Sequence, residues 1–310
     1  MKTQLILLPD EITRHRIDLL RENHVRVLGI HPGGGADTCA LLEDMLAWLA
    51  KEETRKTLDY AAECGMEIEY ELHAGGYLAP RSYYEAHPTW FRESGGKRVP
   101  DWNFCPSADE MLEIVASRAA ELAKKLYRST NRYYFWMDDA PDSWCSCPAC
   151  RGLSVSDQNL LVMNRILREL RRTNPKAELA YLAYYGTMTP PQSVRPAPGI
   201  FLEYAPIERY TPGKGEPTCG TEAMKEQLTA LWRVFDRTKT KILEYWYDNS
   251  LFCGWKKPPQ RLVPDRDRIR AEMAWYRDRG CTYLSSFACY TGEDYLSRYG
   301  DPDFSALREE

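Results

Sequence analysis

Eight short segments with the character of β-strands alternate with amphipathic helical stretches, and this order constrains the fold more than any other feature of the chain. The segments are rich in β-branched and aromatic residues. Strands that alternate with helices pair in parallel through right-handed crossovers. We therefore expect an α/β fold, the (β/α)₈ barrel; an open doubly wound sheet is the alternative, although it usually has fewer strands. The predicted strands are residues 3–8, 25–30, 66–73, 132–137, 178–185, 200–204, 241–247 and 282–287.

The helical segments between these strands have recognisable ends. Asp37 can cap a helical region that runs, in one or two pieces, to Gly65. Ser107 begins a capping box, and Ser154 or Ser156 can cap the next helix. The helices of the fourth and fifth units give the weakest signal. The alternative is therefore a number of strand–helix units that differs from eight by one. Neither a linker nor a repeat divides the chain, which predicts a single domain over residues 1–310.

The loops of the predicted barrel differ in length according to their direction. Links from helix to strand are a few residues long, whereas several links from strand to helix are long and rich in Pro, Gly, Trp and Cys. A barrel gathers its strand-to-helix loops at its C-terminal face, and long loops in compact domains are usually functional. We therefore expect an active site on this face. The long links are residues 74–106, 138–155, 205–220 and 248–264.

Acidic residues stand in or after three of the predicted strands. Asp138 and Asp139 follow the fourth strand, where like charges raise one another's pKa and one acid can hold a proton near neutral pH; solvated acids or amide caps are the alternative. Glu203 and Glu244 lie among apolar neighbours in the sixth and seventh strands, so each must face a polar lumen or a cation. Together these acids would form the carboxylate set of glycoside hydrolysis; structural ion pairs are the alternative.

The 20 Tyr and 9 Trp of the chain are typical of a large mixed core or of a polar cleft walled by rings. His31 and His73 close the second and third strands, where each could bind a sugar hydroxyl or be a core histidine. Glu203 could also bind a hydroxyl. The aromatic residues predicted to wall the sugar sites are Trp90, Trp136, Tyr184, Tyr204 and Trp246.

Charge and hydropathy exclude two classes of partner. The 41 Lys+Arg against 45 Asp+Glu give a net charge of −4, which excludes the broadly basic surface of a nucleic-acid-binding protein. No apolar stretch approaches the ~20 residues that span a bilayer. The first ten residues lack the long apolar stretch and cleavage site of a signal peptide, so we expect a cytoplasmic protein.

Three cysteines, Cys145, Cys147 and Cys150, form a cluster just after the acid pair. Their spacing suits zinc, but a structural tetrahedral site needs a fourth ligand. Cys105 in the preceding loop could supply it. Free thiols or a disulfide are the alternative. We expect no required cofactor, with structural zinc as the alternative.

Several short motifs resemble a known family. His87-Pro-Thr-Trp-Phe91, Gly96-Lys-Arg98 and Phe104-Cys-Pro-Ser107 are followed by Trp144-Cys-Ser-Cys-Pro-Ala-Cys150 and by Pro190-Pro191. This order resembles the bacterial domain-of-unknown-function family 4838, which is similar to glycoside hydrolase family 163. The agreement extends from the third predicted strand to the eighth. The HP-x-WF and W-C-x-C-x-x-C blocks are the most specific.

The resemblance implies a TIM-barrel glycosidase. Family members of known activity are endo-β-N-acetylglucosaminidases, and the family is distantly similar to hexosaminidases. In hexosaminidase barrels an acidic pair after the fourth strand orients the acetamido group and protonates the leaving oxygen. Asp138 and Asp139 match these two positions, although the proton donor there is usually Glu.

We therefore predict a glycoside hydrolase that acts on an oligosaccharide, with an N-acetylhexosamine as the sugar that the resemblance implies. Asp139 is the expected general acid/base, Asp138 the orienting residue and Glu244 the alternative partner. A barrel that binds carbohydrate without cleaving it is the second hypothesis, because the pair lacks its Glu. A zinc- or thiol-dependent enzyme that uses Cys145, Cys147 and Cys150 is the third.

Overall fold

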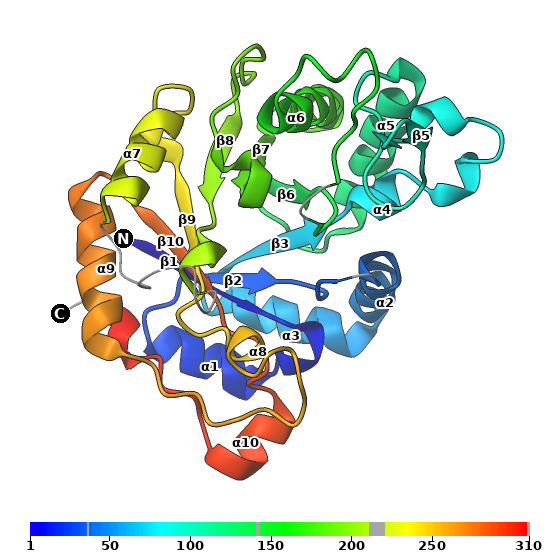
Figure 1. The fold of residues 1–310 in the computed structure, drawn as a ribbon. Helices are drawn as coiled ribbons and strands as arrows, with labels where there is room; N and C mark the ends of the chain where they lie inside the picture. The colour runs from blue at the N-terminus through cyan, green and yellow to red at the C-terminus, as the bar shows by residue number, and fades with distance from the viewer. Residues whose placement is uncertain (36, 141–142, 211–220, 309–310) are drawn as a thin grey trace.

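The computed structural model describes residues 1–35, 37–140, 143–210 and 221–308, and contains a closed barrel of eight parallel strands (Figure 1). Each barrel strand pairs with the next along the sequence, and β10 closes on β1. The prediction of a (β/α)₈ barrel is therefore confirmed. Its strands are β1 Lys2–Leu7, β2 Val27–Ile30, β3 Glu67–His73, β6 Arg132–Trp136, β7 Glu178–Ala183, β8 Ile200–Tyr204, β9 Lys241–Glu244 and β10 Tyr283–Phe287.

Helices surround the barrel on its outside, as Figure 1 shows. Between β7 and β8 the chain forms only the 3-10 turn Tyr185–Met188, which explains the weak helical signal of the fifth unit. The fourth unit, by contrast, holds the longest helix, α6. The α-helices are α1 Arg14–Glu22, α2 Thr38–Ala50, α3 Glu52–Glu63, α4 Gly75–Leu78, α5 Asp109–Lys125, α6 Val155–Thr173, α7 Glu222–Leu231, α8 Asn249–Phe252, α9 Arg266–Asp278 and α10 Glu293–Tyr299.

Two predicted helix starts had different outcomes. The Ser154 hydroxyl accepts a hydrogen bond of 3.0 Å from the N–H of Asp157, so Ser154 caps α6 as predicted. The capping box at Ser107 is wrong, because α5 begins at Asp109 and has no side-chain cap. The Ser107 hydroxyl instead lies 3.1 Å from the Sγ of Cys150. A tertiary contact has replaced the local one.

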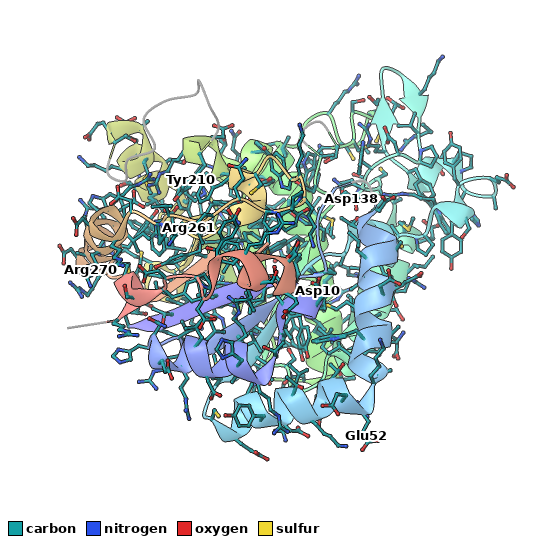
Figure 2. The ribbon with its side chains drawn as sticks, turned by 90° about the horizontal axis from the view of Figure 1, so that it is seen from below. Asp10, Glu52, Asp138, Tyr210, Arg261 and Arg270 are labelled. Carbon is teal, nitrogen blue, oxygen red and sulfur yellow. The ribbon has the colours of Figure 1, made fainter. Side chains whose placement is uncertain are left out.

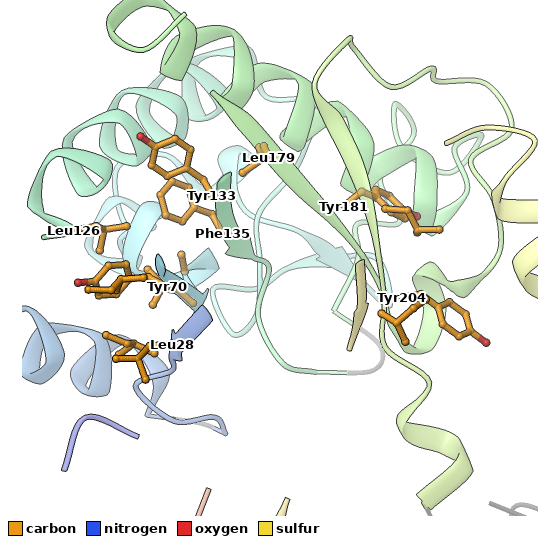
Figure 3. Close-up of a cluster of buried hydrophobic side chains, with 14 of the residues drawn as sticks. Leu28, Tyr70, Leu126, Tyr133, Phe135, Leu179, Tyr181 and Tyr204 are labelled. Atoms are coloured by element: carbon orange, nitrogen blue, oxygen red, sulfur yellow. The ribbon is translucent and has the colours of Figure 1, made fainter. Parts of the chain in front are cut away.

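The outward faces of the strands form the main hydrophobic core together with the helices. Side chains alternate between the two faces of a strand, and the outward ones are mostly apolar. Figure 3 shows part of this layer, with Tyr70, Phe135 and Tyr181 buried in it. Each large apolar side chain buried there stabilises the fold by ~1.5–3 kcal/mol. A register shift of one residue would exchange these side chains for those of the lumen, so this layer fixes the strand register.

Near the cavity, the inward side chains form a charged layer and, above it, an apolar layer. The lower layer is charged: the Lys241 ammonium lies 2.6 Å from a Glu71 oxygen and 2.9 Å from a Glu203 oxygen, and all three side chains are fully buried. Trp136, Leu243 and Phe287 stand nearer the C-terminal ends of β6, β9 and β10. They form an apolar upper layer that lines a cavity. The charged layer therefore lies beneath the floor of that cavity.

The segment between β3 and α5 is the longest described strand-to-helix connection. It contains α4 and the antiparallel hairpin β4 Glu93–Ser94 and β5 Lys97–Arg98. In Figure 1 the hairpin lies beside α5, on the opposite side of the barrel from α9. None of the helices in the described residues combines the length and the apolar character that crossing a bilayer requires.

Candidate active site

A cavity of about 510 Å³ lies at the C-terminal end of the barrel. Its floor consists of side chains at strand ends, and its walls come from the loops that follow the second, fourth, seventh and eighth strands. Two carboxyl groups, those of Asp139 and Asp248, reach it from different loops. The floor residues are His31, His73, Trp136, Leu182, Leu243 and Phe287.

Asp139 lines the cavity three residues after Trp136, the last residue of β6. Within the described residues its carboxylate has no hydrogen-bond partner, so it can contact a ligand. The glycine-rich loop after β2 passes close to it: a Cβ on Gly34 would lie 3.4 Å from the Asp139 Oδ2. Gly33 and Gly35 have φ angles of +125° and +92°, a conformation that favours glycine. This loop forms part of the cavity wall.

Asp248 reaches the cavity from the loop after β9. It caps the short helix α8, where its Oδ1 accepts hydrogen bonds from the Ser250 hydroxyl at 2.5 Å and the Leu251 N–H at 3.3 Å. No described residue bonds to its Oδ2. Burial raises the pKa of Asp248 to about 6, although its hydrogen bonds lower it in part. A buried carboxyl of this kind can hold a proton at mildly acidic pH.

Two tyrosines connect the carboxyls electrostatically. Burial, followed by the charges of Asp248 and Asp139, raises the pKa of Tyr245 well above its ordinary value. Burial also raises the pKa of Tyr184, with smaller contributions from Tyr245 and Asp139. Tyr245 lines the same cavity as both carboxyl groups. Both tyrosines stay protonated, so they can donate hydrogen bonds into the cavity.

His31 and His73 supply polar groups at the cavity floor. The Nδ1 of His31 lies 2.6 Å from the Glu71 carbonyl oxygen, and that of His73 lies 2.9 Å from the Met137 carbonyl oxygen. Because a carbonyl only accepts, each Nδ1 donates, and a neutral His31 ring keeps its Nε2 as an acceptor. Burial, and then the neighbouring His73, lowers the pKa of His31 to about 3, which keeps its ring neutral.

Comparison with protein families identifies the chain. Residues 43–249, more than half of the sequence, match the family described as Domain of unknown function (DUF4838). The chain belongs to the DUF4838 family. This confirms that part of the resemblance, whereas the similarity to glycoside hydrolase family 163 stays a prediction. Comparison with curated protein sequences gives no match.

Solved structures share the fold of this DUF4838 barrel. A tri-modular family 5 (subfamily 4) endo-β-1,4-glucanase from Bacillus licheniformis aligns with a TM-score of 0.56 at 12% identity, over 99% of this chain and 58% of that one. PbGH5A, a glycoside hydrolase family 5 enzyme from Prevotella bryantii B14, aligns with a TM-score of 0.51 at 13% identity, over 95% and 84%. At such identities the likeness shows the (β/α)₈ fold alone.

The two adjacent aspartates face different surroundings in the DUF4838 barrel. Asp138 does not line the large cavity: its Oδ1 accepts from the Gly76 N–H at 2.7 Å, and its Oδ2 accepts from the Asn103 N–H and from Arg81, both at 2.5 Å. Figure 2 shows Asp138 beside the segment that follows β3. Because protein donors occupy both oxygens, the expected substrate-orienting role of Asp138 is not supported.

A prediction separates these two aspartates. Asp138→Ala should lower the free energy of unfolding by about 2–3 kcal/mol, because Arg81 and two buried N–H groups lose their acceptor. Asp139→Ala should change it by no more than ~0.5 kcal/mol. Urea denaturation of both variants measures the difference. Equal, small effects would contradict the structural role of Asp138.

Glu244 is the clearest correction among the predicted acids. It points outward from β9, where its carboxylate binds Arg209 and Tyr276 and accepts from the Tyr210 hydroxyl at 2.7 Å. Figure 2 places Tyr210 well away from Asp138. Glu244 is fully buried and does not line the cavity, so it is not available as a catalytic partner.

Tyr204 and Trp246 share this outward orientation. The Tyr204 hydroxyl donates to Gln227 on α7 at 2.7 Å, and Figure 3 shows Tyr204 among the buried core side chains. The Trp246 Nε1 donates to Glu272 on α9 at 2.6 Å. The prediction that these rings wall a sugar site is wrong, because strand alternation turns them toward the helices.

The remaining predicted residues divide between the cavity and other places. Trp136 and Tyr184 line the cavity together with the two histidines. Glu203 lies in the lumen beneath it, where it accepts a 2.8 Å hydrogen bond from the Trp136 Nε1, so it supports the floor and does not contact the cavity. Trp90 stacks on His87 at a centroid distance of 3.7 Å in the segment after β3, outside the cavity.

Sequence reasoning missed Asp248 and Tyr245. Both belong to the seventh unit, where Lys241-Ile-Leu-Glu244 has a polar residue on each face. Lys241 could have shown which face of this strand points into the lumen, because a buried lysine must lie next to an anion. Placing Lys241 in the lumen puts Leu243 and Tyr245 on the same face and turns Glu244 outward.

Proposed function

We propose that this DUF4838 barrel is a glycoside hydrolase that acts on an oligosaccharide, with Asp139 and Asp248 as its two carboxyl groups. One observation carries the proposal: carboxyls from the loops after the fourth and seventh barrel strands reach the same cavity, which Tyr245 also lines. Hydrolysis of a glycosidic bond needs such a pair, one acid to protonate the leaving oxygen and one carboxylate opposite it. This reaction requires no cofactor.

The surroundings of the two carboxyls suggest their roles. Burial raises the pKa of Asp248 to about 6, so Asp248 is the proton donor. Asp139, partly exposed and without a protein partner in the described residues, is the group that acts as a nucleophile or activates water. This assignment gives the proton to Asp248 and no longer to Asp139.

The other cavity residues suit a polyhydroxylated ligand. His31 offers an acceptor, His73 offers a second imidazole, Tyr184 and Tyr245 offer donors, and Trp136 offers a ring at the floor. A sugar presents both hydroxyl groups and apolar C–H faces, so it needs this mixture of groups. An N-acetylhexosamine as the substrate stays a prediction, because Asp138 is held by Arg81 and backbone groups.

The proposal is tested by incubating the protein with aryl β-glucoside, β-galactoside and N-acetyl-β-glucosaminide, and with oligosaccharides of increasing length. We expect release of product from at least one of them and no release by Asp139→Asn. Calorimetry with the same compounds tests the alternative, a barrel that binds carbohydrate without cleaving it. Binding without product after long incubation would show a carbohydrate-binding barrel and overturn the proposal.

A further prediction concerns the mouth of the cavity. Trp255 lines it and is 65% exposed, as a ring that stacks on an outer sugar would be. Trp255→Ala should raise KM roughly 3- to 10-fold for the longest oligosaccharide and leave kcat unchanged. Tyr299→Ala on α10, 37% exposed and outside the cavity, is the control. An unchanged KM for the longest substrate would exclude Trp255 from binding.

A further inference from the structure

Four buried cysteines meet beside the barrel. Cys105 comes from the segment between β3 and α5, whereas Cys145, Cys147 and Cys150 come from the segment between β6 and α6. Their exposed fractions are at most 3%. Their sulfur atoms all lie within 4.8 Å of one another. All four are free thiols, so no disulfide explains the convergence.

The distances between these sulfurs fit a tetrahedron around a metal ion. The Sγ of Cys105 lies 3.7 Å from that of Cys147 and 3.7 Å from that of Cys150. With a Zn–S bond of about 2.3 Å, the edge of a ZnS₄ tetrahedron is about 3.8 Å. The sulfurs thus already stand at ligand spacing. Cys105 also provides the fourth ligand that the three clustered cysteines lack.

Polar groups around the cluster favour negatively charged sulfur. The Glu93 N–H donates to the Sγ of Cys145 at 3.3 Å, and the Arg98 guanidinium lies 3.9 Å from the same sulfur. The Ser107 hydroxyl lies 3.1 Å from the Sγ of Cys150. Hydrogen bonds of this kind orient metal ligands and stabilise thiolates. If the four thiols were neutral and bound no metal ion, these donors would have no negatively charged sulfur to bind.

We propose that Cys105, Cys145, Cys147 and Cys150 bind a structural Zn²⁺ ion. Four cysteine ligands fill a tetrahedral site and leave no position for water or substrate, which is typical of structural zinc. None of the four lines the large cavity. The zinc- or thiol-dependent enzyme considered from the sequence is therefore not favoured, because the cluster is separate from the candidate active site.

The ion would cross-link two long segments that already contact each other. Near the cluster, the Ser146 N–H donates to the Glu93 carbonyl at 2.9 Å, and the Asn103 Nδ2 donates to the Ser143 hydroxyl at 2.8 Å. The segment that carries Cys145 also carries Asp138 and Asp139. Zinc would hold these segments together and so stabilise the loop that presents Asp139. The site itself stands on the sulfur geometry and does not depend on the proposed hydrolysis.

The test is the metal content of the protein, purified without chelators or a metal-affinity step and measured by mass spectrometry. We expect about one zinc ion per chain. Replacement of the metal by Co²⁺ should give the intense visible and near-ultraviolet absorption of a tetrahedral thiolate site. Both measurements use the unaltered protein, so they do not depend on whether a variant folds.

Variants locate the site. Cys105→Ser and Cys150→Ser should each lower the zinc content at least ~10-fold. Cys281→Ala is the matched control, because Cys281 is equally buried but belongs to the hydrophobic core and not to the cluster. This variant should bind as much zinc as the wild type. Four titratable thiols in a metal-free wild type, a Cys105 disulfide, or stoichiometric iron would each overturn the proposal. Zinc content is measured independently of catalysis, so an inactive protein with bound zinc would refute only the proposed hydrolysis.

Discussion

Asp248→Asn is expected to lower kcat on an oligosaccharide by ~10²–10⁴-fold, the contribution of a positioned proton donor. The reason is that asparagine cannot supply the proton that Asp248 holds in its buried environment. Wild-type activity should also fall as the pH rises through the pKa of Asp248, about 6. Kinetics on an oligosaccharide and on a dinitrophenyl glycoside measure the effect. The dinitrophenolate leaves without a proton, so the variant should retain much more activity on that substrate.

Asp139→Asn is the companion variant. Because Asp139 is proposed to act as the nucleophile or to activate water, the variant should lose activity on both substrates alike, since that role does not depend on the leaving group. Its melting temperature should not change, since no described residue bonds to the Asp139 carboxylate. If Asp139→Asn shows the leaving-group dependence instead, the two roles are reversed. If neither variant loses activity, the carboxyl pair is wrong.

The same Asp248→Asn change should make the protein more stable at pH 7.5. A raised pKa means that the folded chain holds the proton more tightly than the unfolded chain. The free energy of unfolding of the wild type therefore falls as the pH rises from about 4 to about 6, and stays lower above that. Asparagine does not titrate and can still cap α8 through its oxygen. The variant should gain up to ~2–3 kcal/mol at pH 7.5 and nothing near pH 3.

Lys241→Met is expected to lower the free energy of unfolding by ~3–5 kcal/mol, the largest stability effect predicted for a single change in this barrel. Lys241 is fully buried between Glu71 and Glu203. Its removal leaves the buried carboxyl groups of Glu71 and Glu203 without the ammonium group that lies between them. Thermal and urea denaturation measure the loss.

The pH dependence of this variant gives a second check. Burial raises the pKa of Glu71, and Lys241 lowers it in part. Without Lys241 the Glu71 carboxyl should hold its proton more strongly, so the deficit in stability should grow between pH 5 and pH 8. Lys239→Met is the control: Lys239 lies 2.8 Å from Glu178 but is 49% exposed, and its loss should cost no more than ~1 kcal/mol. A Lys241→Met protein as stable as the control would show that the triad does not stabilise the barrel.

The amino-acid pattern was sufficient to predict the barrel, its elaborated rim and the DUF4838 motifs. The alternation of strands with helices leaves few ways to pair, and the long strand-to-helix links mark the face where a site can form. Asp139, Trp136, Tyr184 and the histidines that follow the second and third strands were found because they stand at strand ends on that face. Strand ends are visible in a sequence.

The face of each strand that points into the barrel became clear only from the packing of the strands against the helices. Both faces of a barrel strand are buried, so hydrophobicity does not distinguish them, and Glu244, Tyr204 and Trp246 were assigned to the wrong face for that reason. Asp248 entered the site through a turn beyond its strand, where alternation no longer applies. Cys105 joined a cluster about 40 residues away in sequence, a proximity set by packing between segments. Local patterns specify elements, whereas the meeting of distant side chains depends on how those elements pack.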